Sequence, residues 1–144
     1  MSLRIINVNN GPEPEEEYVM LKAFANIHLG GYALVGRSFL LNDTECERCD
    51  KKIRHIYNFP NHRVKKGEYV LLVTGVGTDK KYTDIEGDTI HKFHWNSAEC
   101  IWNNTSDEAV LIQYEVISKH EVPPLDKVGA QTPLPPDTDS SIII

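Results

Sequence analysis

The chain has 144 residues, of which 40% are hydrophobic and 25% are charged. This length and composition fit one domain with a buried core and exclude a wholly disordered chain. The longest strongly apolar stretch, 69–73, is far shorter than the roughly 20 residues of a membrane-spanning helix. The first residues also lack a signal-peptide pattern. We therefore expect a cytoplasmic protein with no membrane span.

The net charge of −6 is unevenly distributed. Residues 1–17 and 121–144 each contain one basic and four acidic groups, so each end carries −3 and the middle nets zero. Such a total is not typical of a dedicated nucleic-acid-binding domain. A local cluster can still attract phosphates or acidic partners, although a solvated hairpin face is the commoner explanation. One such cluster lies in 51–66, which holds no acid and contains Lys51, Lys52, Arg54, Arg63, Lys65 and Lys66.

Short runs rich in valine, isoleucine, leucine and tyrosine are separated by glycine, proline and asparagine, which predicts strands. No apolar stripe with helical spacing persists over three turns. About seven or eight short strands indicate an all-β fold, either a two-sheet sandwich or a small barrel. In chain order we expect strands at 18–24, 32–35, 38–41, 55–59, 69–74, 91–95 and 109–116, with a long polar loop at 75–88.

The inward positions of these alternating strands predict the hydrophobic core. We expect Trp102 to be its largest member, because a buried indole can anchor a sandwich. The full predicted core set is Val19, Leu21, Tyr32, Leu34, Phe59, Val70, Leu72, Trp102 and Leu111.

The composition changes near residue 121, because the last 24 residues contain five prolines. Proline lacks the N–H group that a sheet ladder needs. We therefore expect a β-sandwich domain at 1–120 and an acidic, proline-rich tail without regular secondary structure at 121–144. The last three residues, all isoleucine, are unusually apolar for a free tail.

Several segments follow a recognisable order. An opening strand at 3–8 precedes an acidic loop, and 17–22 has the form Glu-aromatic-Val-x-aliphatic. A Leu-x-Gly-aromatic-x-Leu element follows at 29–34. The segment 55–75 then contains a Phe-Pro turn, a Lys-Gly turn and a central strand. The last element, at 101–111, contains a Trp-Asn pair followed by an Asp-Glu-Ala-Val-Leu run.

Together these elements resemble the lamin-tail domain family over about residues 3–117. The resemblance implies an immunoglobulin-like two-sheet β-sandwich. It carries over no catalytic residues, and it implies attachment to proteins, membrane-associated structures or nucleic acids by sandwich surfaces. Two features depart from the family pattern: an insertion at 44–52, and a last strand that continues through Ile117.

The sharpest local motif is the C-x-x-C pair Cys46 and Cys49, which resembles half a zinc knuckle. A closed zinc site would need Cys100 and one of His55, His91 and His94 as well. A reversible dithiol is another interpretation, but the sequence around the pair lacks a thioredoxin-like βαβ pattern. We expect ordinary free thiols and no metal.

Other candidate groups also favour structural roles. His91 and His94 are three apart on a predicted strand, so they should face opposite sides, one towards solvent and one packed. The carboxylates of Asp84, Glu86 and Asp88 could hold a hard cation, but they lack EF-hand spacing. The segment 75–78 lacks the Lys-Ser/Thr ending of a phosphate loop.

We therefore expect no catalytic, cofactor-binding or metal-binding residues and no enzyme activity. The leading hypothesis is a non-catalytic binding or scaffolding module that recognises a protein partner. The first alternative, which is less favoured, is a nucleic-acid-binding or phosphate-binding accessory domain that uses the basic residues of 51–66. The second alternative is a small metal or thiol protein that uses Cys46, Cys49 and Cys100.

Overall fold

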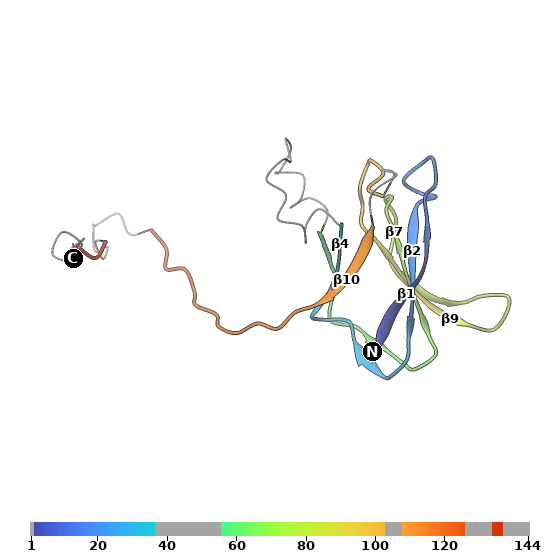
Figure 1. Cartoon of the computed structure of the whole chain (residues 1–144), viewed down its shortest axis with the longest axis horizontal. Helices are drawn as coiled ribbons and strands as arrows, with labels where there is room; N and C mark the ends of the chain where they lie inside the picture. The colour runs from blue at the N-terminus through green and yellow to red at the C-terminus, as the bar shows by residue number, and fades with distance from the viewer. Residues whose placement is uncertain (1, 37–55, 103–107, 126–133, 137–144) are drawn as a thin grey trace, which may run out of the picture.

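The structure is a computed structural model, and it describes residues 2–36, 56–102, 108–125 and 134–136 (Figure 1). The predicted strand at 38–41 lies outside these ranges. Within them the fold is all-β, as predicted, and no helix is long and apolar enough to cross a membrane. The described strands are β1 (Leu3–Asn9), β2 (Tyr18–Ala23), β3 (Ile27–His28), β4 (Tyr32–Gly36), β5 (Ile56–Asn58), β6 (Arg63–Val64), β7 (Tyr69–Val73), β8 (Lys80–Thr83), β9 (Thr89–His94) and β10 (Ala109–Gln113).

The strands form three sheets. The largest has the order β1-β2-β7-β9-β8, the second has the order β10-β4-β5, and β3 pairs with β6 in a small third sheet. All pairs are antiparallel except β7 with β9. Because β7 and β9 are parallel, the chain must cross between them, and β8 lies on that connection at the edge of the sheet.

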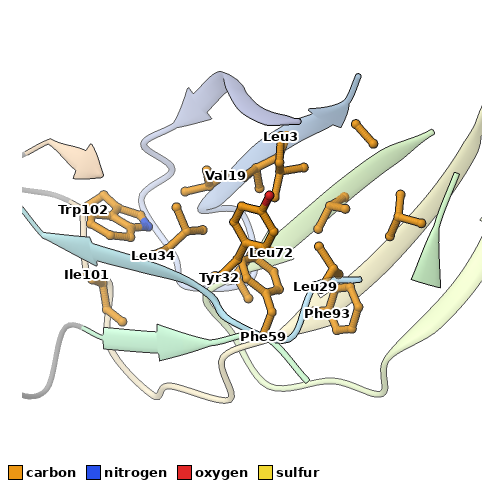
Figure 2. Packing of buried hydrophobic residues seen from close by; sticks show 14 residues of the cluster. Leu3, Val19, Leu29, Tyr32, Leu34, Phe59, Leu72, Phe93, Ile101 and Trp102 are labelled. Atoms are coloured by element: carbon orange, nitrogen blue, oxygen red, sulfur yellow. The ribbon is translucent and has the colours of Figure 1, made fainter. Parts of the chain in front are cut away.

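The three sheets share one core, as expected for a sandwich (Figure 2). Eight of the nine predicted core residues are buried, among them Trp102 at 5% exposure. The ninth, Leu111, is only partly buried, because it lies on β10 at the edge of the three-stranded sheet. Burying one such large apolar side chain contributes about 1.5–3 kcal/mol, so this shared core is the main source of stability.

Trp102 is positioned by a buried carboxylate. Glu17, which immediately precedes β2, is fully buried and accepts hydrogen bonds from the Thr74 hydroxyl (2.7 Å) and the Ile101 amide (2.7 Å). Its other oxygen accepts from the Trp102 amide at 3.2 Å. These bonds compensate for the desolvation of the carboxylate. They also fix the segment before residue 103 against the end of the large sheet.

The expectation of a continuous loop at 75–88 is wrong. The segment contains β8, which sequence patterning missed because an exposed edge strand carries polar residues: Lys80 and Lys81 are exposed. The loop before it is tightly packed. A Cβ atom at Gly75 would meet the Glu15 backbone nitrogen at 2.8 Å, so glycine serves close packing here.

The chain leaves the sandwich at the end of β10 (Figure 1). Residues 114–125 are exposed and form no strand, and the same holds for 134–136. The Tyr114 amide donates to the Gly31 carbonyl at 2.7 Å, and no helix or strand follows within these described residues. Beyond that bond, the chain extends away from the sheets.

Candidate binding surface

The large sheet has a second apolar face, opposite the shared core, which we call the outer face. Directly paired residues project to the same side of a sheet, so the strand register defines rows of neighbouring side chains. The first row of the outer face crosses all five strands: Arg4, Lys22, Tyr69, Ile90 and Tyr82.

The next row is built in the same way and contains Asn7, Met20, Leu71, Lys92 and Lys80. Leu71, Val73 and Ile90 form the buried centre of the face, and the partly buried residues around them come from the same sheet. The centre is therefore covered by its own neighbouring side chains. Within the described residues, no member of this cluster comes from another sheet.

Cations lie around this apolar centre. The Lys22 ammonium is 5.4 Å from the centre of the Tyr69 ring and 5.6 Å from that of Phe24. At the other edge, the Lys80 ammonium is 5.4 Å from the centre of the Tyr82 ring. Attraction between a cation and an aromatic ring orients these flexible side chains along the surface.

The charged residues in the strands of the large sheet are all basic. Its five strands contain five lysine or arginine residues and no aspartate or glutamate, although acidic residues outnumber basic ones by 21 to 15 in the whole chain. Four of the five cations, all except Lys81, lie in the two outer-face rows. The outer face thus combines an apolar, tyrosine-rich centre with a cationic rim, and it suits an acidic ligand.

The predicted basic patch is only partly within the described residues. Lys51, Lys52 and Arg54 lie outside them. Arg63, Lys65 and Lys66 are exposed on β6 and the turn that follows. In that turn the backbone amide of Lys65 donates to the Glu68 carboxylate at 2.9 Å and that of Lys66 donates to the Asn26 side chain at 2.9 Å. The structure therefore places three of the six residues near one another.

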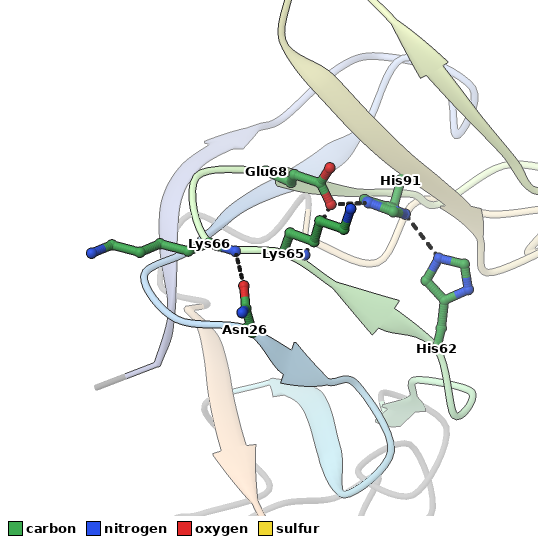
Figure 3. A network of polar contacts seen from close by, with 6 residues as sticks. All are labelled: Asn26, His62, Lys65, Lys66, Glu68 and His91. Carbon is green, nitrogen blue, oxygen red and sulfur yellow. Dashed lines mark hydrogen bonds and ion pairs between the residues drawn. The ribbon is translucent and has the colours of Figure 1, made fainter.

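Beside this turn, three polar side chains form a chain of hydrogen bonds (Figure 3). The Nε2 atom of His91 is 2.8 Å from the Glu68 Oε1, and its Nδ1 atom is 2.8 Å from the Nε2 of His62. Because an ionised carboxylate only accepts, His91 donates through Nε2 to Glu68. In the contact between His91 Nδ1 and His62 Nε2, one ring nitrogen donates and the other accepts, according to the tautomers of the two rings. We call these residues the His62–His91–Glu68 chain.

Two pKa shifts accompany this arrangement. Burial lowers the pKa of His62, and the charges of His91 and Lys81 lower it further. Burial alone would raise the pKa of Glu68, but the hydrogen bonds from the Lys65 amide and from His91 outweigh burial and lower it. Both shifts favour an ionised Glu68 and a neutral His62 near neutral pH.

The expectation that one histidine of the 91–94 pair faces solvent is wrong, because both are buried. His91 contacts Glu68 and His62, whereas the Asp79 Oδ1 accepts from the His94 amide at 2.8 Å and lies 3.2 Å from His94 Nδ1. The strand is covered on both sides, so alternation alone does not expose either ring. The two histidines have separate partners and do not converge on one ligand.

Like the basic patch, the set of candidate cysteines is only partly within the described residues. Cys46 and Cys49 lie outside them, and Cys100 lies within them. The Cys100 Sγ lies 3.7 Å from the Gly11 carbonyl and 3.8 Å from that of Pro12. Burial raises the pKa of the Cys100 thiol, and the Glu17 carboxylate raises it further. A raised pKa disfavours the reactive thiolate.

The acidic cluster of Asp84, Glu86 and Asp88 lies in the turn between β8 and β9, with its oxygens within 4.8 Å of one another. Asp84 accepts hydrogen bonds from the amides of Glu86 (3.0 Å) and Asp88 (2.8 Å). These contacts are those of a side chain that closes a tight turn. They account for Asp84 without a cation.

Comparison with known proteins adds no assignment: no model of a known protein family matches the chain, and no curated protein matches it. The resemblance to the lamin-tail domain family therefore stays a prediction. The outer face was not predicted from the sequence. The signal in the sequence that could have indicated it is the absence of acidic residues from the five strand segments.

Proposed function

We propose that this domain is a non-catalytic binding module whose outer face recognises an acidic protein partner. The observation that carries the proposal is the outer face itself, where an apolar and tyrosine-rich centre is surrounded by Arg4, Lys22, Lys80 and Lys92. Protein interfaces combine an apolar, aromatic centre with a polar rim. A carboxylate-bearing partner matches the sign of this rim.

A nucleic acid is the second candidate ligand, because lysine and arginine also bind phosphates. Two observations favour a protein. The cations already contact the aromatic rings of Phe24, Tyr69 and Tyr82, which limits the ring surface left for base stacking. In addition, the partly buried side chains that cover the aliphatic centre are of the aromatic and methionine types enriched at protein interfaces, namely Tyr18, Met20, Tyr69 and Tyr82.

A pair of charge-reversed variants tests the proposal. The probe is a labelled peptide in which glutamate alternates with leucine. Lys22→Glu combined with Lys92→Glu should weaken its binding at least about tenfold, because both changes place a carboxylate against an acidic ligand. The matched control, Lys65→Glu with Lys66→Glu, changes the net charge equally in the turn after β6 and should bind within about twofold of the natural chain.

Two outcomes contradict the proposal. Loss of binding in the control but not in the outer-face variant would assign the function to the basic patch. Tighter binding of single-stranded oligothymidylate than of the peptide, with a steep dependence on salt, would favour the nucleic-acid candidate. Equal melting temperatures of the two variants would show that the comparison reports binding and not folding.

The proposal that the chain is a metal or thiol protein depends on Cys46 and Cys49 and is the least supported. Zinc analysis of untagged protein tests it: one metal per chain would contradict our expectation of free thiols.

A further inference from the structure

The segment that follows β10 is an exposed stretch of chain that mixes apolar and polar residues. Tyr114, Val116, Ile117 and Val122 are exposed by 44%, 58%, 88% and 87%. Residues 114–122 contain no proline, and the Tyr114 amide donates to Gly31 within its own chain, so residues 115–122 can donate a backbone N–H to a new strand, whereas Pro123 and Pro124 cannot. Valine, isoleucine and tyrosine favour the extended conformation of a strand. The segment therefore has the composition of a strand without a sheet.

The large sheet offers an edge of matching size. Within the described residues, β1 pairs with β2 on one side only. Its Ile6 and Val8 side chains are exposed by 47% and 39%, and Arg4 is its one charged residue. The register with β2 shifts between Ile5 and Asn7, and Ile6 has no partner in β2. An exposed apolar edge presents unpaired backbone groups to another strand.

These two features are complementary in length and charge. β1 has seven residues and the segment 114–122 has nine, so the segment can cover the whole edge. The segment carries Glu115, Lys119 and Glu121, a net charge of −1, whereas β1 carries Arg4 and no acid. In Figure 1 the segment runs away from the sheets of its own chain. It therefore does not pair with β1 of that chain.

We propose that residues 114–122 of one copy pair as an added strand with the free edge of β1 in a second copy, and that the exchange is reciprocal. Each copy then supplies one strand and receives one, which closes a twofold dimer. Main-chain hydrogen bonds would provide the pairing, and Val116 and Ile117 would cover Ile6 and Val8. This inference does not depend on the proposed function of the outer face.

Sedimentation equilibrium of the full chain, from micromolar to millimolar concentration, tests the dimer. We expect twice the chain mass of 16.3 kDa. Ile117→Pro should yield a monomer, because it removes an N–H and blocks the added strand. Its matched control, Leu125→Pro, lies beyond the proline pair in an equally exposed position and should stay dimeric. Neither change lies in a described strand, so at concentrations low enough to dissociate the dimer the natural chain and both variants should share one melting temperature.

Variants on the receiving edge locate the contact. Val8→Lys should also yield a monomer, because a charge at a sheet edge opposes strand addition. Ile6→Lys provides the same test if the first variant does not fold. A natural chain that stays monomeric at millimolar concentration, or an Ile117→Pro variant that stays dimeric, would overturn the proposal. If Val8→Lys or Ile6→Lys folds and stays dimeric, the proposal that β1 receives the added strand is wrong.

Discussion

Glu17 shows how one residue can connect distant parts of the sequence. It precedes β2, yet its carboxylate receives hydrogen bonds from residues 74, 101 and 102. It is one of the few fully buried polar side chains among the described residues. The sequence motif around residue 17 indicated a strand start, but not these bonds, because partners more than fifty positions away leave no local pattern.

The variant Glu17→Gln should lower the free energy of unfolding by about 2–3 kcal/mol. Glutamine retains one acceptor oxygen, but its amino group would face backbone amides that also donate. Urea denaturation measures the change. Glu16→Gln is the control, because Glu16 is exposed next to Glu17 and its substitution should change stability by less than about 0.5 kcal/mol. Equal effects of the two substitutions would show that the Glu17 carboxylate is not required.

The His62–His91–Glu68 chain predicts a pH dependence of stability. The pKa of His62 is lower in the folded chain than its ordinary value of 6.5, so the unfolded chain binds protons more readily. This contribution to stability is complete above pH 6.5 and is lost as the pH falls through the folded pKa. The lowered pKa of Glu68 acts in the same direction below its ordinary value of 4.5.

Thermal melting of the natural chain and of His62→Gln between about pH 8 and 5 measures this effect. The natural chain should lose more stability on acidification than the variant, because glutamine does not titrate in that range. His28→Gln removes an exposed histidine on β3 and should leave the pH dependence unchanged. Parallel profiles for the natural chain and His62→Gln would contradict the role of His62.

At the scale of elements, strands with apolar alternation could be predicted and polar ones could not. β2, β4 and β7 agree with the predicted ranges because their buried residues repeat along the strand. β8 was missed because its sequence, Lys-Lys-Tyr-Thr, carries no apolar repeat. The same limit applies to the outer face. The sequence of one strand predicts which of its residues share a face, but the rows across the sheet depend on strand order and register. Strand order and register cannot be predicted from the sequence of a single strand.

The order of strands predicts where the sheet is most stable. β7 lies at the centre, with β2 on one side and β9 on the other, whereas β8 pairs with β9 alone. Hydrogen exchange should therefore be slowest at the amides of Val70, Leu71 and Leu72 and clearly faster at those of Lys80–Thr83. Equal protection of β7 and β8 would contradict this sheet order.

At the scale of the whole molecule, the net charge of the chain and the charge of the large sheet have opposite signs. The chain carries a net charge of −6, which argued against a polyanion-binding domain, yet the large sheet collects five cations without an acid. Folding separates the charges, because the acidic residues that the structure describes all lie outside its strands. The pattern of short apolar runs therefore predicted the fold class, whereas the net charge of the chain did not indicate a binding face.

The central claim is that the outer face binds an acidic protein segment. Mapping of backbone amide chemical shifts by NMR, during titration with the peptide of alternating glutamate and leucine, tests it most directly. We predict saturable shifts confined to the outer-face rows, centred on Lys22, Tyr69 and Lys92, with little change at Arg63, Lys65 and Lys66. Shifts centred on those last three residues, or the absence of saturable shifts on the large sheet, would contradict the claim.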